Sequence, residues 1–242
     1  MSEPPVLYSP RAWVEPASYR ADDWRTAASW PPPGAEAVRL QLHADGTLQP
    51  DASATGGMRT FTCDPRHPIP TRGGRNMLIE AGPADQREVR ALPGYGLIYR
   101  GAPLTADMTL AGPANVTLTF ASDCPDADVI AKLVEVQPDG RALLLADGVV
   151  RAMYQDGPTP EPLQSGVPVE LTIRLGHVCH TIKAGCRLDL DIVGSNFPRR
   201  ARNTHSGRPH RAADRDTDIR LATNAFQHQP AAPCYVGLTI LP

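Results

Sequence analysis

Two histidines and two cysteines lie within ten residues of one another. The segment holds side chains that bind zinc or take part in acid–base and nucleophilic chemistry: His177, Cys179, His180 and Cys186. Because successive side chains of a strand point to opposite faces, His177 and Cys179 would share one face and His180 would take the other. The spacing fits no common zinc motif, and thiols in strands are more often small core residues than nucleophiles. We expect neither a metal nor a cofactor here.

A polar loop runs from Ser195 to Gly207. Pro198 cannot donate to a β ladder, so we expect the preceding strand to end before it. The arginines of the loop could bind a carboxylate or a phosphate, but no aromatic side chain lies among them for bases to stack on. We therefore favour a solvated loop over a nucleic-acid site, with ion pairs to an acidic run at Asp214, Asp216 and Asp218.

No other catalytic or metal-binding motif is complete. The sequence has no Gly-x-Ser-x-Gly nucleophile elbow, and hydrogen bonding within the loop is the simpler role for Ser195 and Ser206. One acidic turn has oxygen ligands of the kind that calcium prefers, at Asp123, Asp126 and Asp128. Its spacing is not that of a calcium loop, so we expect these carboxylates to cap the turn instead.

The candidate functional residues form two sets. If the chain is itself an enzyme, its general acids and bases would be His177, His180, Asp189 and His205. If it binds a ligand or partner through the polar loop, the contacting residues would be Asn196, Arg199, Arg202 and Asn203. Both sets depend on the strands that would position them.

The strand that carries Asp189 alternates between charged and apolar residues. Within Arg187–Val193, positions 188, 190 and 192 are apolar and would point one way, whereas Asp189 and Asp191 would point the other. The pattern predicts a half-buried antiparallel strand. Lys183-Ala-Gly185 is the predicted turn before it.

Short strand patterns with turn signals between them recur from Gly96 onward. This rhythm is typical of an all-β sandwich or jelly roll. Val167–Leu175 has five alternating apolar positions, and residues 126–136 favour a strand over a helix because they are rich in β-branched side chains. The predicted strands are Leu97–Arg100, Met108–Ala111, Val116–Ala121, Val129–Val136, Ala142–Ala146, Val167–Leu175, Arg187–Val193, Ile219–Thr223 and Tyr235–Leu241.

The first part of the chain is less regular. Residues 1–35 are rich in proline and contain three tryptophans, which predicts an extended arm whose aromatic side chains dock on the sandwich: Trp13, Trp24 and Trp30. Ala37–His43 alternates as a strand and residues 50–75 are predicted to be a loop. We divide the chain into residues 1–95, the arm and first strands, and residues 96–242, the jelly roll, and expect them to pack as one unit.

Composition narrows the function. The 242 residues are 41% hydrophobic, enough for a core, and their formal net charge of −2 gives no electrostatic attraction to nucleic acid or to membranes. No apolar run has membrane-spanning length, and the residues after Met1 lack the pattern of a signal peptide. The five scattered cysteines fit reduced thiols, so we expect a cytoplasmic protein.

The order of these motifs resembles the C-terminal domain of the X-prolyl dipeptidyl aminopeptidase and cocaine-esterase (CocE/NonD) serine hydrolases. Matching segments lie along nearly the whole chain: Ser29-Trp-Pro-Pro32, Asp45-Gly-Thr-Leu48, Pro68-Ile-Pro-Thr71, Gly73-Gly74, Gly82-Pro-Ala-Asp-Gln86, Leu110-Ala-Gly-Pro113, Gly148-Val-Val-Arg151, Gly185, Arg187, Ser195-Asn-Phe-Pro-Arg199, Arg202-Asn203 and Gly207. The resemblance implies a jelly-roll β-sandwich of galactose-binding-like type that packs against an α/β-hydrolase domain and does not carry the Ser-His-Asp triad.

Three functions are compatible with this sequence. The first is a free-standing accessory or binding module for an α/β-hydrolase that acts on esters or amides. The second is a small self-contained enzyme that hydrolyses an ester or cyclises a small molecule in a pocket of the sandwich. The third is a carbohydrate-binding module, which ranks last because aromatic residues are only 5% of the chain and the tryptophans cluster in the arm.

Overall fold

The structure is a computed structural model that describes residues 5–13, 23–51, 56–77, 79–209, 214–229, 231 and 234–242. These residues form a small hairpin, one eleven-stranded sheet and a single-turn helix. In chain order the elements are β1 Val6–Tyr8, β2 Arg25–Ala27, β3 Glu36–Leu42, β4 Thr47–Gln49, β5 Gly57–Cys63, α1 Arg87–Arg90, β6 Leu97–Gly101, β7 Met108–Ser122, β8 Asp128–Val136, β9 Ala142–Arg151, β10 Val169–Ile182, β11 Arg187–Val193, β12 Ala222–His228 and β13 Tyr235–Leu241, with 3-10 turns at Ala152–Tyr154 and Asp216–Asp218.

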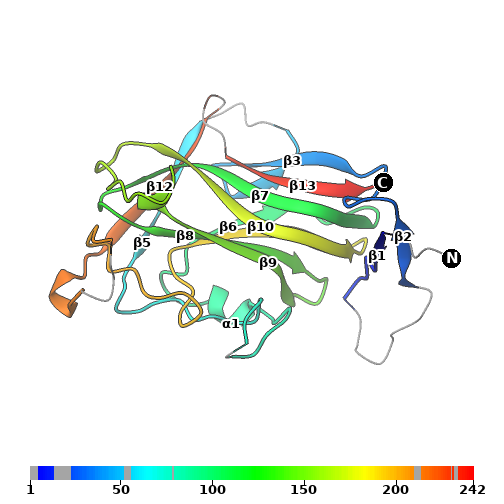
Figure 1. Ribbon diagram of the computed structural model, residues 1–242, viewed down its shortest axis with the longest axis horizontal. Helices are drawn as coiled ribbons and strands as arrows, with labels where there is room; N and C mark the ends of the chain where they lie inside the picture. The colour runs from blue at the N-terminus through cyan, green and yellow to red at the C-terminus, as the bar shows by residue number, and fades with distance from the viewer. Residues whose placement is uncertain are drawn as a thin grey trace.

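The sheet folds over on itself into two layers (Figure 1). One layer is centred on β7, which pairs with β10 along one side and with β12 and β13 along the other. The second layer has the order β6, β11, β8, β9. The short β4 joins the layers, because it pairs with β3 and, in parallel, with β6. The predicted all-β jelly-roll sandwich is confirmed.

Alternating apolar side chains fill the space between the layers. In β10, Leu171, Ile173 and Leu175 are all 0% exposed, and burial of each contributes about 1.5–3 kcal/mol to stability. The prediction was wrong for Val167, which is 45% exposed because the strand begins two residues later, at Val169.

The strand β7 replaces two predicted strands. The sequence predicted separate strands at Met108–Ala111 and Val116–Ala121, and Pro113, which cannot donate to a ladder, lies between them. The strand continues through Pro113 because the register of its neighbour β13 shifts between Gly237 and Ile240, at the same level. One fifteen-residue strand therefore spans the layer.

Other boundaries also differ from prediction. β9 ends at Arg151 instead of Ala146, and β10 ends at Ile182 instead of Leu175. Part of the predicted loop 50–75 is the strand β5, which pairs with β12 and stacks Phe61 on Phe226 with ring centroids 5.9 Å apart. The strand predicted to start at Ile219 is β12, which starts at Ala222, after a 3-10 turn at Asp216–Asp218. For β5 and β12, the pairing partner lies far away in the sequence.

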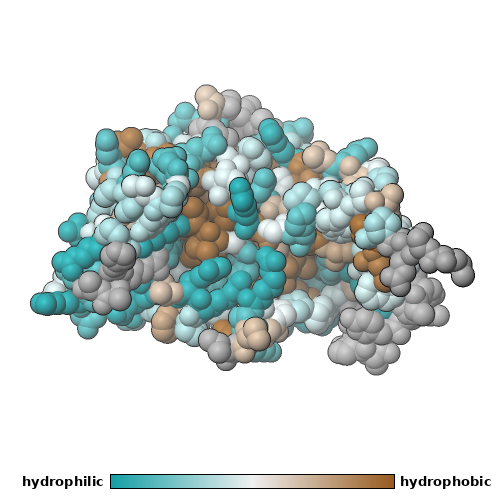
Figure 2. All heavy atoms as spheres, viewed as in Figure 1, coloured by the Kyte–Doolittle hydropathy of each residue, from teal (hydrophilic) through white to brown (hydrophobic). Residues whose placement is uncertain are grey.

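The strand β11 is buried on both faces, which corrects the predicted half-buried strand. Leu188, Leu190 and Ile192 face the core as expected, but Asp189 and Asp191 on the other face are also 0% exposed. The helix α1 lies over that face and packs Val89 against apolar residues of the layer. Figure 2 shows a hydrophilic band at the place of α1, below a hollow lined with apolar atoms.

Arg90 of α1 neutralises this buried face. Its guanidinium donates to both carboxylate oxygens of Asp191, at 2.6 and 2.8 Å, and to Asp189 at 3.2 Å. Tyr95 adds a third bond to Asp191, at 2.7 Å. Burial raises the pKa of Asp189 and lowers the pKa of the neighbouring Lys132 to about 8. The second layer of the sandwich therefore depends on one arginine, Arg90, to neutralise two buried carboxylates.

The substitution Arg90→Met is expected to lower the free energy of unfolding by about 3–5 kcal/mol, because it leaves two carboxylates buried without their cation. Arg141→Met is the matched control, since the ion pair of Arg141 with Asp139 is exposed and contributes at most about 1 kcal/mol. Urea unfolding of both variants measures the difference. Equal losses would show that the buried network does not hold the layer.

A second prediction concerns pH. His228 lies 2.9 Å from the Tyr99 hydroxyl in the core, and burial lowers its pKa to about 4. Between pH 6.5 and 4 the unfolded chain takes up a proton that the folded chain does not. The free energy of unfolding should therefore fall by about 3 kcal/mol over that window. His228→Gln should remove this part of the pH dependence in urea titrations; an unchanged slope would contradict the assignment.

Candidate functional site

The polar loop is fixed to the domain where it leaves β11. The backbone N–H of Ile69 donates to Ser195 Oγ at 2.7 Å, and the backbone of Phe197 bonds to Ile69 and Thr71. The Ser195 hydroxyl thus holds a neighbouring segment in place, in agreement with the structural role predicted for it.

Two of the predicted contact residues turn inward. Asn196 is 3% exposed and donates to Asp147 at 3.3 Å. Arg199 forms an ion pair with the same carboxylate. Both side chains thereby fasten the start of the loop to β9.

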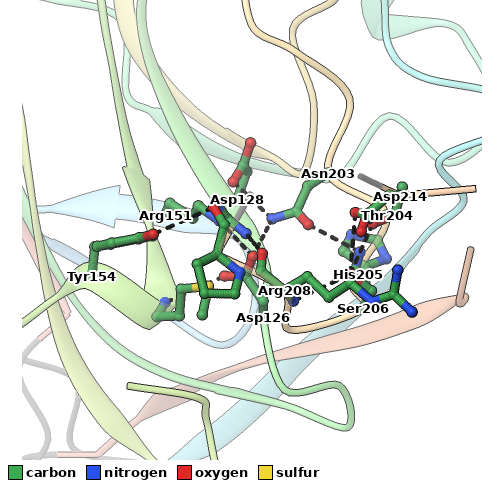
Figure 3. A network of polar contacts seen from close by, with 12 residues as sticks. Asp126, Asp128, Arg151, Tyr154, Asn203, Thr204, His205, Ser206, Arg208 and Asp214 are labelled. Atoms are coloured by element: carbon green, nitrogen blue, oxygen red, sulfur yellow. Dashed lines mark hydrogen bonds and ion pairs between the residues drawn. The ribbon is translucent and has the colours of Figure 1, made fainter. Parts of the chain in front are cut away.

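A second network holds the middle of the loop (Figure 3). The Asn203 amide donates to Asp126 at 3.0 Å and to Asp128 at 2.9 Å, and Arg151 donates to Asp126 at 2.6 Å. Arg151 also donates to the carbonyl oxygen of Arg208. The two buried carboxylates of the acidic turn are therefore bonded to side chains of the chain itself. Within the described residues, no group of three or more His, Cys, Asp or Glu side chains could hold a metal ion.

His205 belongs to this network and is 1% exposed. Its backbone has φ of 60°, in the left-handed region, and its Nδ1 lies 2.8 Å from the carbonyl oxygen of Arg220. Thr204 and Ser206 bond to Asp214. Among the four predicted contact residues, Arg202 is the one with an exposed side chain, and it pairs with Asp216 as expected.

Two of the predicted catalytic residues line one groove, whose volume is about 530 Å³. His177 and His180 line it from β10. Trp13 lines it from the arm and Arg75 from the loop between β5 and α1, and β9 forms a further wall. Trp30 Nε1 donates to His177 Nδ1 at 2.7 Å, so this ring nitrogen is an acceptor. The docking predicted for the aromatic arm is thus found for Trp30.

His180 has a buried acidic partner. Its Nε2 lies 2.5 Å from Glu135 Oε2, and Glu135 is 2% exposed on β8. Such a pair can hold an imidazole in one orientation and can move a proton. Burial raises the pKa of the nearby thiols, Cys179 and Cys186, which is the reverse of what a nucleophilic cysteine needs.

Asp189 and His205 lie away from the groove. Asp189 is held by Arg90 and Arg187 under α1, and His205 lies in the loop network. Glu135, Arg75 and Arg90 were not predicted from the sequence. An acidic residue between apolar neighbours, as Glu135 lies between Val134 and Val136, is the signal that could have revealed a buried partner.

No helix in the described part of the chain combines the length and the apolar character needed to cross a membrane. All five cysteines are free.

Comparison with known proteins finds a family and relatives that this chain resembles. Residues 1–237 match the family described as the X-Pro dipeptidyl-peptidase C-terminal non-catalytic domain. Cocaine esterase from Rhodococcus sp. strain MB1 Bresler is 30% identical over 232 residues, which cover 91% of this chain and 40% of the esterase.

Solved structures agree with this match. An α-amino acid ester hydrolase superposes with a TM-score of 0.82 at 25% identity, over 90% of this chain and 39% of that one. An aminopeptidase from a marine sediment Thaumarchaeota archaeon superposes with a TM-score of 0.88 at 23% identity, over 100% of this chain and 41% of that one. The chain spans about two fifths of the length of these relatives. It belongs to the X-Pro dipeptidyl-peptidase C-terminal non-catalytic domain family.

Proposed function

We propose that the chain is an accessory domain that packs against an α/β-hydrolase domain acting on esters or amides, and that the hydrolase supplies the nucleophile. The observation that carries this proposal is the match of residues 1–237 to a domain described as non-catalytic. The relatives support it, because about three fifths of cocaine esterase lies outside the matched part. The absence of a Gly-x-Ser-x-Gly motif from the sequence agrees with it.

We place the contact surface at the N-terminal arm. Leu7 is 60% exposed and Trp24 51%, and Trp13 at the groove is 39% exposed. Exposed apolar side chains that gather in one region are typical of protein interfaces. The polar loop is less suited to this role, because Asn196 and Asn203 are buried within the domain. Figure 1 shows the arm and the orange loop at opposite ends of the sandwich.

A tagged copy of the chain, expressed in its native host, is expected to recover an α/β-hydrolase in stoichiometric amount, identified by mass spectrometry. Trp24→Ala should reduce that recovery about tenfold or more, because exposed tryptophans are frequent hot spots of binding. Val167→Ala is the control, since Val167 is 45% exposed outside the arm. Failure to recover a hydrolase would contradict the accessory role; equal recovery by both variants would contradict the arm as its surface.

One observation favours a second candidate, the self-contained enzyme. The groove brings His177 and His180 together, and His180 is bonded to buried Glu135.

The purified chain alone is expected to hydrolyse p-nitrophenyl acetate no faster than buffer, because neither nearby thiol is activated. Turnover that His180→Ala abolishes, with an unchanged circular dichroism spectrum, would favour the enzyme instead. His67→Ala is the control, since His67 is exposed and lies outside the groove.

A further inference from the structure

A second cleft, separate from the groove, lies beside α1 and is lined by arginine. Its volume is about 530 Å³, within the range of about 300–1,000 Å³ that small-molecule sites occupy. Four arginines line it from three elements: Arg87 and Arg90 from α1, Arg100 from β6 and Arg187 from β11. Pro103 and Pro138 supply rigid apolar walls. None of its described lining residues is acidic.

The carboxylates that balance Arg90 and Arg187 lie behind the cleft, whereas Arg87 pairs with Asp85, which does not line it. Asp189 accepts from both Arg90 and Arg187 and is 0% exposed. It therefore aims two guanidinium groups from below without offering a negative charge to the cleft itself. This gives Asp189, a predicted catalytic residue, a positioning role instead.

Arg100 has no such partner. It stands directly opposite Asp189 in the β6–β11 ladder, so their side chains leave the same face of the sheet. Its side chain is exposed, and it forms no ion pair with any described residue. Arg187 is 35% exposed and uses only Nε toward Asp189, which leaves its two terminal nitrogens free to donate.

We propose that this cleft binds a small anionic molecule that carries a phosphate or carboxylate group. A guanidinium group presents two parallel N–H donors that match either group, and it keeps its charge at every physiological pH. Arg100 and Arg187 make the direct contacts, Arg90 closes the inner end, and the two prolines contact the organic part of the ligand. The inference does not depend on the proposed role as an accessory domain.

Isothermal titration calorimetry of the whole chain at low ionic strength tests this site, with pyrophosphate and citrate as probes and glucose as a neutral control. At least one anion is expected to bind with one-to-one stoichiometry and to bind more weakly as salt is added. Binding of pyrophosphate alone identifies a phosphate ligand, binding of citrate alone a carboxylate ligand, and binding of both the shared chemistry. If neither anion binds at millimolar concentration, the proposal is overturned.

Arg100→Gln and Arg187→Gln should each weaken binding about tenfold, because each removes a charge-assisted contact. Arg174→Gln removes the same charge at an exposed position of β10 outside the cleft and should leave affinity unchanged. The Arg100 side chain is exposed and forms no ion pair with any described residue, so its substitution should also leave the melting temperature unchanged. If Arg174→Gln weakens binding as much as Arg100→Gln does, the attraction is a general charge effect and the site is rejected.

Discussion

The buried pairing of Arg90 with Asp191 and Asp189 sets what can cover the second layer of the sandwich. Removing carboxylates from water costs several kcal/mol per charge, so the face that carries them cannot be closed by apolar residues alone. The segment across it must supply a cation at one point and apolar contacts beside it. Arg90 and Val89 meet both demands from a single turn of helix. An isolated helix of that length would not be stable, so the ion pair also holds the helix in place.

The same principle organises the polar loop. Asn203 and Arg151 compensate Asp126 and Asp128, and Asn196 and Arg199 bond Asp147. Three of these four polar groups come from the loop, and Arg151 comes from β9. The loop is therefore part of the domain rather than an attachment to it. The arm differs from the loop, because its Leu7 and Trp24 remain exposed although its Trp30 docks on His177.

Features that depend on a local pattern of residues could be predicted from the sequence. The alternation in Arg187–Val193 identified the strand and its core face, and the motif order identified the family. It could not reveal what covers the opposite face, because Arg90 lies 101 residues away from Asp191. Asn203 was predicted to contact a ligand or partner, but its side chain is buried. Its partner Asp126 lies 77 residues away, so the local pattern did not show this pairing. Strand alternation predicted opposite faces for His177 and His180, whereas both residues line the same groove beside β10.

The three-residue strand β4 has a wider consequence. By pairing with β3 on one side and β6 on the other, it continues the ladder from one layer into the next. Two strands that would otherwise end in unpaired backbone groups are thus protected from joining a strand of another molecule. On this flank, resistance to edge-to-edge aggregation therefore depends on β4, which is itself too short to pair with a second chain. The flank formed by β9 and β10 lacks that protection, and there the arm and the neighbouring loop occupy the opening instead.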